Sequence, residues 1–263
     1  MKKLLFITLS MSVLLTSCKE NTKQETTSEM VKKEVIEQKE TKASLDFTPI
    51  THATMVMNYD DETIYVDPTG GKAAFADFKQ PTIILITDIH GDHLSIDTLK
   101  ELNLNGTIIV APQAVVDKFP EDFKPMFKVL NNGQTAVVKG INIEAIPMYN
   151  LREEALKFHE KGRGNGYVLT FGDERVYISG DTEDIPEMRN LKNIDKAFVC
   201  MNLPYTMPVE SAASSVLDFK PKTVYPYHFR GTEGLSDVEK FKSIVNEGNP
   251  DINVELLEWY PNQ

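Results

Sequence analysis

Four side chains that commonly bind metal ions lie within one short stretch of the sequence. Asp88, His90, Asp92 and His93 directly follow the strongly apolar run Thr82 to Ile86, which predicts a buried strand. Imidazole and carboxylate groups are ligands that Zn²⁺ accepts, at about 2.0–2.2 Å. The stretch therefore predicts a metal site at the end of a strand. A solvated turn that carries these residues by chance is the alternative.

Two later predicted strands end in the same residue types. Val176 to Ile178 is followed by Asp181, and Thr223 to Tyr227 is followed by His228. Because sites in open α/β sheets gather at the carboxyl ends of strands, we expect Asp181 and His228 to meet the first cluster. The three turns together favour a metal site over chance more strongly than the first turn alone.

The elements that must position these side chains are short strands with helices spaced among them. The pattern predicts strands at 53–57, 63–67, 82–86, 108–110, 141–146, 167–171, 176–178, 197–201 and 223–227, and helices at 95–102, 209–219 and 237–246. This order predicts sheets covered by helices, an α/β fold. The sequence shows no internal repeat, so we interpret residues 47–263 as one domain.

The chain begins with the features of an export signal. Two lysines precede an apolar run, residues 4–15, that is too short to span a bilayer in a mature protein. The sequence Leu-Thr-Ser-Cys that ends at Cys18 resembles the lipobox of bacterial lipoproteins. The resemblance implies that residues 1–17 are removed, that Cys18 is lipidated and that the protein is anchored in the cell envelope. A soluble secreted protein is the alternative.

Residues 18–46 predict a flexible tether, because they are rich in Lys, Glu and Thr and nearly free of large apolar side chains. Eight of the 28 basic and seven of the 39 acidic residues precede residue 47, which leaves the domain with 20 and 32, a net charge of −12. A surface of this charge disfavours RNA or DNA as a partner and favours a small-molecule substrate.

The sequence resembles the metallo-β-lactamase-fold hydrolase superfamily, and within it the small UlaG-like metal-dependent hydrolases. The matching pieces cover the domain in family order and are His52–Thr54 with Tyr65–Pro68, Ile89–His93, Ile146–Asn150, Phe158–Gly162, Gly166–Val168, Ser179–Thr182, Pro204–Met207 and Pro226–His228. The resemblance implies an αββα sandwich with the metal centre at one edge, between two sheets.

The resemblance also implies a site for each of two metal ions. Asp92, His93, Asp181 and His228 match the second site of the family, in which Asp181 bridges the two ions. In the first site His90 matches, while Asp88 stands where the family has its first histidine. The family's later histidine has no counterpart in the stretch that ends at Asn150.

Asp88 allows two interpretations. As a ligand it makes the site more anionic than an all-histidine site, and so favours Mn²⁺ or Fe²⁺ beside Zn²⁺. Otherwise the first site is empty, and Asp88 holds His90 or a water molecule by hydrogen bonds. We predict one or two divalent ions, with a metal-free relic of the site as the remaining alternative.

A bound metal predicts hydrolysis, because a catalytic Zn²⁺ lowers the pKa of water from 15.7 to about 7. We expect Asp92 to orient this water toward an ester, lactone, amide or phosphodiester. A Gly-x-Ser-x-Gly motif is absent from the sequence, and Cys200 lies in an apolar run that predicts a buried structural thiol. β-Lactamase activity is disfavoured, because the first site lacks the family's full set of histidines.

His159 lies in the polar loop Leu151 to Asn165, which the resemblance places at the active site. We expect it either to donate a proton to the leaving group or to serve as a ligand, and one or two cations of this loop to hold an anionic substrate. A solvated loop is the alternative. His52 could line the pocket, but we favour a structural histidine held by hydrogen bonds at the start of a strand. Tyr205 is interpreted as part of the pocket wall.

A non-catalytic reading stays open beside the hydrolase. A lipoprotein that had lost part of its first metal site could keep the fold as a metal-binding or ligand-binding module. Asp88 and Asn150, where the family has histidines, favour this alternative. The identity of the substrate does not follow from the fold.

Overall fold

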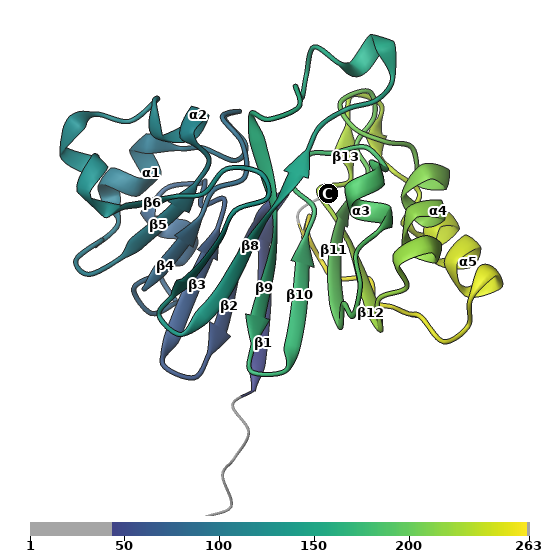
Figure 1. Cartoon of the computed structure of the whole chain (residues 1–263), viewed down its shortest axis with the longest axis horizontal. Coiled ribbons are helices and arrows are strands. Elements are labelled where there is room, and N and C mark those ends of the chain that lie inside the picture. The colour runs from purple at the N-terminus through teal and green to yellow at the C-terminus, as the bar shows by residue number, and fades with distance from the viewer. Residues whose placement is uncertain (1–43, 262–263) are drawn as a thin grey trace, which may run out of the picture. The chain divides into compact units, whose positions relative to one another are not determined.

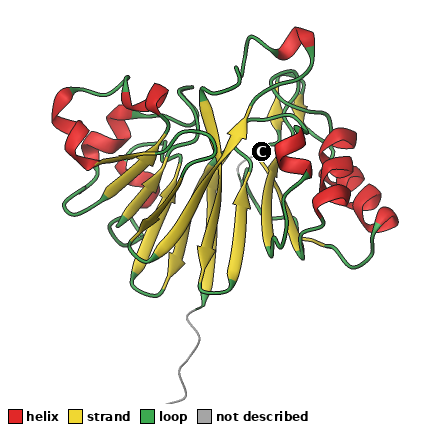
Figure 2. Ribbon diagram, viewed as in Figure 1, coloured by secondary structure: helices red, strands yellow, loops and turns green. Residues whose placement is uncertain are grey.

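The computed structural model describes residues 44–261. They form two β-sheets packed face to face, with helices on the outer face of each sheet (Figure 1, Figure 2). This αββα sandwich is the predicted fold. The predicted export signal, Cys18 and most of the predicted tether lie outside the described residues. Between residues 44 and 261, none of the helices has the length and hydrophobicity that a membrane crossing needs.

The first sheet has six strands in the order of the sequence. They are β1 (Leu45–Thr51), β2 (Thr54–Tyr59), β3 (Glu62–Val66), β4 (Ile83–Leu85), β5 (Ile108–Ala111) and β6 (Phe127–Val129). The first three strands are antiparallel, and β3 to β6 run parallel. Four helical segments lie between the strands of this sheet in the sequence: η1 (Lys72–Phe75), α1 (Ile96–Glu101), α2 (Gln113–Val116) and η2 (Glu121–Met126). Ser95 is the N-cap of α1, as predicted, and accepts a hydrogen bond from the Thr98 amide.

The second sheet has seven strands in the order β15-β12-β11-β10-β9-β8-β7. Their bounds are β7 (Thr135–Val138), β8 (Ile141–Met148), β9 (Gly164–Phe171), β10 (Glu174–Ile178), β11 (Lys196–Cys200), β12 (Thr223–Tyr227) and β15 (Asn253–Val254). The helical segments of this half are η3 (Glu153–Ala155), α3 (Pro186–Arg189), α4 (Val209–Phe219) and α5 (Val238–Gly248). A small hairpin joins β13 (Arg230–Gly231) and β14 (Gly234–Leu235).

Alternating apolar side chains place the first sheet between two hydrophobic layers. Met55 and Met57 of β2 face the layer between the sheets, whereas Val56 faces the layer under α1 and α2. β4 repeats the pattern, with Ile83 facing the second sheet and Ile84 facing the helices. Both faces are covered, so these strands are apolar throughout, as is usual for buried strands. Replacing Ile83 with alanine is expected to cost about 2–5 kcal/mol.

Several predicted boundaries need correction. β1 begins at Leu45, so the last two residues assigned to the tether belong to the sheet, paired with β2. The polar loop predicted to run to Asn165 ends earlier, because β9 begins at Gly164. β6 and β7 were not predicted, since neither carries a clear apolar pattern. By contrast, α4 and β12 have the predicted bounds.

The site lies at the edge where β3, β4, β10 and β12 end. Asp67 and His228 follow β3 and β12 with φ of 44° and 47°, in the left-handed region that L-residues rarely adopt. Such residues cost about 1–3 kcal/mol and cluster at functional sites. Gly180, with φ of 61°, precedes Asp181, and a Cβ here would lie 2.5 Å from Met148 Sδ. The turn after β10 therefore needs glycine.

Candidate metal centre

One group of possible ligands joins residues from the first and second sheets. His93 follows β4, Asp181 follows β10 and His228 follows β12, and all three are buried. The Nε2 atoms of His93 and His228 lie 3.4 and 3.3 Å from the carboxylate oxygens of Asp181, and 3.2 Å from each other. The three predicted turns therefore meet.

Asp92 lines the pocket and completes this group, which is the second group because its residues match the predicted second metal site. Its Oδ2 lies 3.3 Å from His228 Nε2, its Oδ1 lies 3.9 Å from His93 Nε2, and its side chain is 43% exposed. Burial alone would raise the pKa of Asp92, but hydrogen bonds from His228 and His52 hold it well below its ordinary value. Asp92 is therefore an ionised carboxylate that solvent and substrate can reach.

A buried carboxylate orients His93. Asp67 Oδ2 lies 2.8 Å from His93 Nδ1, and Thr87 donates hydrogen bonds to both oxygens of Asp67. With its proton on Nδ1, His93 turns the lone pair of Nε2 toward Asp181, which is the arrangement of carboxylate–histidine–metal sites. Burial lowers the pKa of His93, but Asp181 and Asp67 outweigh burial and raise it well above the ordinary value. Sequence reasoning assigned no role to Asp67, although it follows directly on a buried strand.

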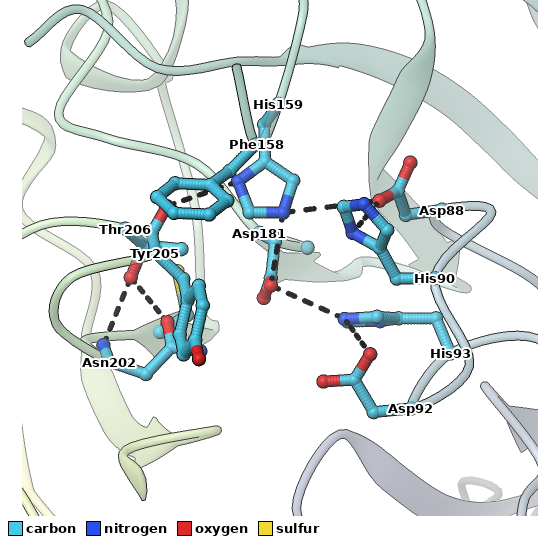
Figure 3. A network of polar contacts seen from close by, with 12 residues as sticks. Asp88, His90, Asp92, His93, Phe158, His159, Asp181, Asn202, Tyr205 and Thr206 are labelled. Carbon is cyan, nitrogen blue, oxygen red and sulfur yellow. Dashed lines mark hydrogen bonds and ion pairs between the residues drawn. The ribbon is translucent and has the colours of Figure 1, made fainter. Parts of the chain in front are cut away.

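The first group, formed by Asp88, His90 and His159 at the predicted first metal site, lies on the other side of Asp181. His90 Nδ1 is 2.7 Å from Asp88 Oδ2, and His159 Nε2 is 3.9 Å from the same oxygen. His159 Nε2 is also 3.3 Å from Asp181 Oδ2, so Asp181 lies between the two groups, as Figure 3 shows. His159 thus brings a third side chain to the first site, which the sequence appeared to lack.

The surroundings of His159 fix the direction of its ring. Its Nδ1 lies 3.2 Å from the carbonyl oxygen of Tyr205, to which it can donate a hydrogen bond. Asn150 Nδ2 donates to the carbonyl oxygens of Ala155 and Tyr205, so Asn150 holds the loop in place instead of facing Asp181. With the proton on Nδ1, the lone pair of Nε2 points at the carboxylates.

The guanidinium of Arg163 forms a buried ion pair with Asp88. Its Nε and Nη2 donate to the two carboxylate oxygens of Asp88 at 3.1 and 3.0 Å. Asp88 is fully buried, which raises its pKa, but His90, His93 and Arg163 together lower the pKa to about 2. Asp88 is therefore anionic at neutral pH, while its Oδ2 still faces His90 and His159.

The donor set fits a metal ion. His159 Nε2 and Asp181 Oδ1 are buried and have no hydrogen-bond partner. The facing Nε2 atoms of His93 and His228 cannot both be acceptors at 3.2 Å without a proton or a cation nearby. Buried polar groups are normally satisfied, and a divalent cation in each of the two groups would satisfy these atoms.

A pocket of about 290 Å³ opens over both groups. It is lined by His52, His90, Asp92, Phe158, His159, Asp181, Asn202, Tyr205 and Arg230. The rings of Phe158 and Tyr205 meet edge to face, with centroids 5.0 Å apart, and form an aromatic wall. Tyr205 therefore occupies the predicted place in the pocket wall.

His52 both lines the pocket and is held by hydrogen bonds. Its Nδ1 lies 2.8 Å from the hydroxyl of Tyr260, and its Nε2 lies 3.4 Å from Asp92 Oδ2. Burial, as the largest effect, lowers the pKa of His52. Both roles named for this residue are thus present.

The cations predicted to hold an anionic substrate are engaged elsewhere. Arg152 pairs with Glu183 and Lys161 with Glu187, while Lys157 lies over the ring of Phe158. None of these three lines the pocket. Arg230, which sequence reasoning passed over, is the basic side chain among the described residues that line it.

Cys200 is fully buried, and its Sγ donates a weak hydrogen bond to the carbonyl oxygen of Thr182 at 3.4 Å. Burial raises the pKa of this thiol to about 12. A thiolate nucleophile is therefore absent at neutral pH at this position, as the sequence predicted.

The comparisons with known proteins agree with this geometry. The model of a family described as "Beta-lactamase superfamily domain" matches residues 46–228. A UPF0173 metal-dependent hydrolase from Pyrococcus abyssi is 30% identical over 194 residues, which cover 70% of this chain and 85% of that protein.

Two solved structures are similar. A metal-dependent hydrolase from Parabacteroides distasonis has a TM-score of 0.71 and 38% identity, and the match covers 83% of this chain and 94% of that one. Igni18, a metallo hydrolase from Ignicoccus hospitalis, has a TM-score of 0.67 and 21% identity over 81% of this chain and 94% of that one, which shows the fold alone. The chain therefore belongs to the beta-lactamase superfamily and is a metal-dependent hydrolase.

Proposed function

We propose that the protein binds two divalent metal ions and uses them to hydrolyse a small ester, lactone or phosphodiester. Asp88, His90 and His159 would hold one ion, Asp92, His93 and His228 the other, and Asp181 would contact both. The observation that carries this proposal is His159 Nε2, a buried and unpartnered nitrogen 3.3 Å from the shared carboxylate. His159 would supply the later histidine of the first site, which the sequence lacks in the stretch that ends at Asn150. The lack of that histidine was one reason to consider a non-catalytic binding protein.

The charge of the site bears on the choice of metal. Two divalent ions carry a charge of +4, and Asp88, Asp92 and Asp181 offset three of these charges. Such a site accepts Zn²⁺, and its three carboxylates also suit Mn²⁺ and Fe²⁺ better than an all-histidine site would. We propose zinc as the resident metal, with manganese and iron as the competitors to be measured.

The side chains divide the hydrolytic work among them. A bound divalent cation acidifies a water molecule and withdraws charge from the oxygen of the substrate. Asp92, ionised and 43% exposed, is placed to accept the proton of the attacking water and return it to the leaving oxygen. In the tautomer that donates its Nδ1 hydrogen to the Tyr205 carbonyl, His159 carries no proton on Nε2 to give to a leaving group, and Nε2 lies 3.3 Å from Asp181. Its role as a ligand is favoured over its role as an acid.

A small substrate agrees with the pocket and with the charge of the domain. The pocket of about 290 Å³ is at the lower limit of small-molecule pockets, which span about 300–1,000 Å³. The net negative charge of residues 47–263 disfavours a nucleic acid. We further propose that the enzyme works in the cell envelope, tethered through a lipid on Cys18.

Metal dependence and a single side chain test the hydrolase proposal together. Protein stripped by chelation is reloaded with Zn²⁺, Mn²⁺ or Fe²⁺ and assayed on aryl ester, lactone and phosphodiester reporters. We expect hydrolysis of at least one class to depend on added metal, and Asp92→Asn to lower kcat by about 10²–10⁴-fold when assayed at a metal concentration that keeps both sites occupied. Asp97→Asn is the matched control, since that side chain is 93% exposed on α1.

Two results would count against this account. Hydrolysis that survives both chelation and Asp92→Asn would show that the metal centre is not the active site. Stoichiometric metal without turnover of any reporter would favour the binding module that the sequence left open.

A further inference from the structure

Arg230 is a basic residue that lines the pocket. It lies in β13, two residues after His228, and lines the same pocket as Asp92 and Asp181. The chain has four other arginines, and each forms an ion pair with a carboxylate. The pairs are Arg152–Glu183, Arg163–Asp88, Arg175–Glu144 and Arg189–Asp184. Among the described residues, no carboxylate pairs with Arg230.

The hydrogen-bonding capacity of Arg230 is incompletely used. Its Nε is buried and has no hydrogen-bond partner. The guanidinium carbon lies 4.3 Å from the centre of the Tyr260 ring, so this ring supports the cation from one side. The guanidinium of Arg230 thus keeps unused donor capacity, and because Arg230 lines the pocket, an anionic oxygen bound there could accept hydrogen bonds from it.

The backbone holds Arg230 in this position. The next residue, Gly231, lies so close to Leu203 that a Cβ would come within 1.8 Å of the Leu203 carbonyl oxygen. β13 also pairs with β14 through Arg230 and Leu235. The ring of Tyr260 lies against the guanidinium of Arg230, and the hydroxyl of Tyr260 forms a hydrogen bond with His52. His52 in turn lies 3.4 Å from Asp92. These contacts connect Arg230 to the residues of the metal centre.

The pocket combines one cation with an aromatic wall. Phe158 and Tyr205 offer apolar contact area, and Arg230 offers a planar group that can bind a carboxylate through two hydrogen bonds. A single arginine matches one negative charge, which favours a monoanion over a phosphate dianion. The small volume limits the substrate to a short acyl chain.

We propose that Arg230 binds a carboxylate on the substrate, so that the preferred substrates are small esters or lactones that carry one free carboxylate. This inference rests on the proposed hydrolysis, whose ester or lactone bond would lie at the metal centre while the carboxylate lies against Arg230. It assigns Arg230 to substrate binding and makes the pocket selective for charge.

Matched esters test this directly. The metal-loaded full chain is assayed on monomethyl and dimethyl esters of the dicarboxylic acids from malonate to adipate, with initial methanol release followed by NMR. We expect the wild type to prefer the monoester at one chain length. Arg230→Gln should lower the ratio of monoester to diester kcat/KM by about 10- to 100-fold, mainly through the KM of the monoester. Arg230→Lys should restore part of the ratio, and Arg175→Gln, in β10, should leave it unchanged.

The outcomes separate the inference from the hydrolase proposal. If kcat/KM for the monoester and for the diester fall equally in Arg230→Gln, the proposed carboxylate binding is refuted. The hydrolase proposal is then unaffected. If the wild type hydrolyses neither ester, ester hydrolysis is refuted, and NMR titration with the monomethyl esters then decides the binding. Equal Kd values for wild type, Arg230→Gln and Arg230→Lys would overturn the inference. Circular dichroism melting shows whether each variant is folded.

Discussion

Replacing His159 with alanine removes the side chain that distinguishes a complete first metal site from a partial one. His159 Nε2 lies 3.3 Å from Asp181 Oδ2 and 3.9 Å from Asp88 Oδ2, within the reach of one shared ion. We therefore expect His159→Ala to weaken the binding of one metal ion strongly and the binding of the other only slightly.

The magnitude follows from the number of ligands. In the proposed site, Asp88, His90 and His159 would hold the first ion together with Asp181, so the variant would lose one of four donors. Removing a residue that merely orients a ligand costs about 10- to 100-fold in metal affinity. The loss of a direct ligand should cost at least about 100-fold, or ~2.8 kcal/mol.

The assay counts metal ions and measures their affinity. Metal-free protein is titrated with Zn²⁺ in competition with a chromophoric chelator, and bound metal is determined by mass spectrometry after dialysis. The wild type should retain two ions and His159→Ala one, and free imidazole should restore part of the second. Phe158→Leu, next in the chain but without a ligand atom, controls for disturbance of the loop.

Two results would refute this reasoning. If His159→Ala retains both ions with unchanged affinity and only kcat falls, the residue transfers a proton and is not a ligand. If neither the metal content nor kcat changes, the loop around His159 has no part in the site.

Three further predictions concern residues around the centre and the N-terminus. Asp67→Asn should lower the affinity for the second ion by about 10- to 100-fold in the same competition assay, because the Nδ1 atom of His93 loses its carboxylate partner. Unchanged affinity would contradict this orienting role. Arg163→Gln should lower the free energy of unfolding in urea of the metal-free protein by about 3 kcal/mol, because Asp88 loses its buried ion-pair partner. The loss should be smaller with metal present, since the cation then neutralises Asp88. An equal loss in both states would show that Asp88 does not contact the ion. Cys18→Ser should abolish labelling by radioactive palmitate and move the protein from the membrane to the soluble fraction, whereas continued labelling would place the lipid elsewhere.

The parts of the site that lie close together in the sequence were predictable. Asp88, His90, Asp92 and His93 share one turn after a buried strand, so residue type and spacing alone indicated a metal site. Asp181 and His228 also follow strands, and the rule that sites gather at strand ends placed them correctly. The alternation of apolar residues in β2 and β4 likewise predicted the packed sheets.

The remaining parts depend on contacts between distant segments. His159 reaches Asp181 because Asn150 and Tyr205 hold its loop over the site, and neither contact follows a local pattern. Arg230 looks like an ordinary surface arginine in the sequence, and only the folded chain shows that no acidic residue among positions 44–261 pairs with it. β6 and β7 were missed because they are only partly buried and lack the continuous apolar run that marked the equally short β4 and β5.

Anomalous diffraction from crystals of the metal-loaded protein, recorded on either side of the metal absorption edge, tests the central claim most directly. We predict two peaks, one among Asp88, His90 and His159 and the other among Asp92, His93 and His228, with Asp181 in contact with both. A single peak in the second group, with His159 Nε2 bonded to water or turned away, would contradict the two-metal account.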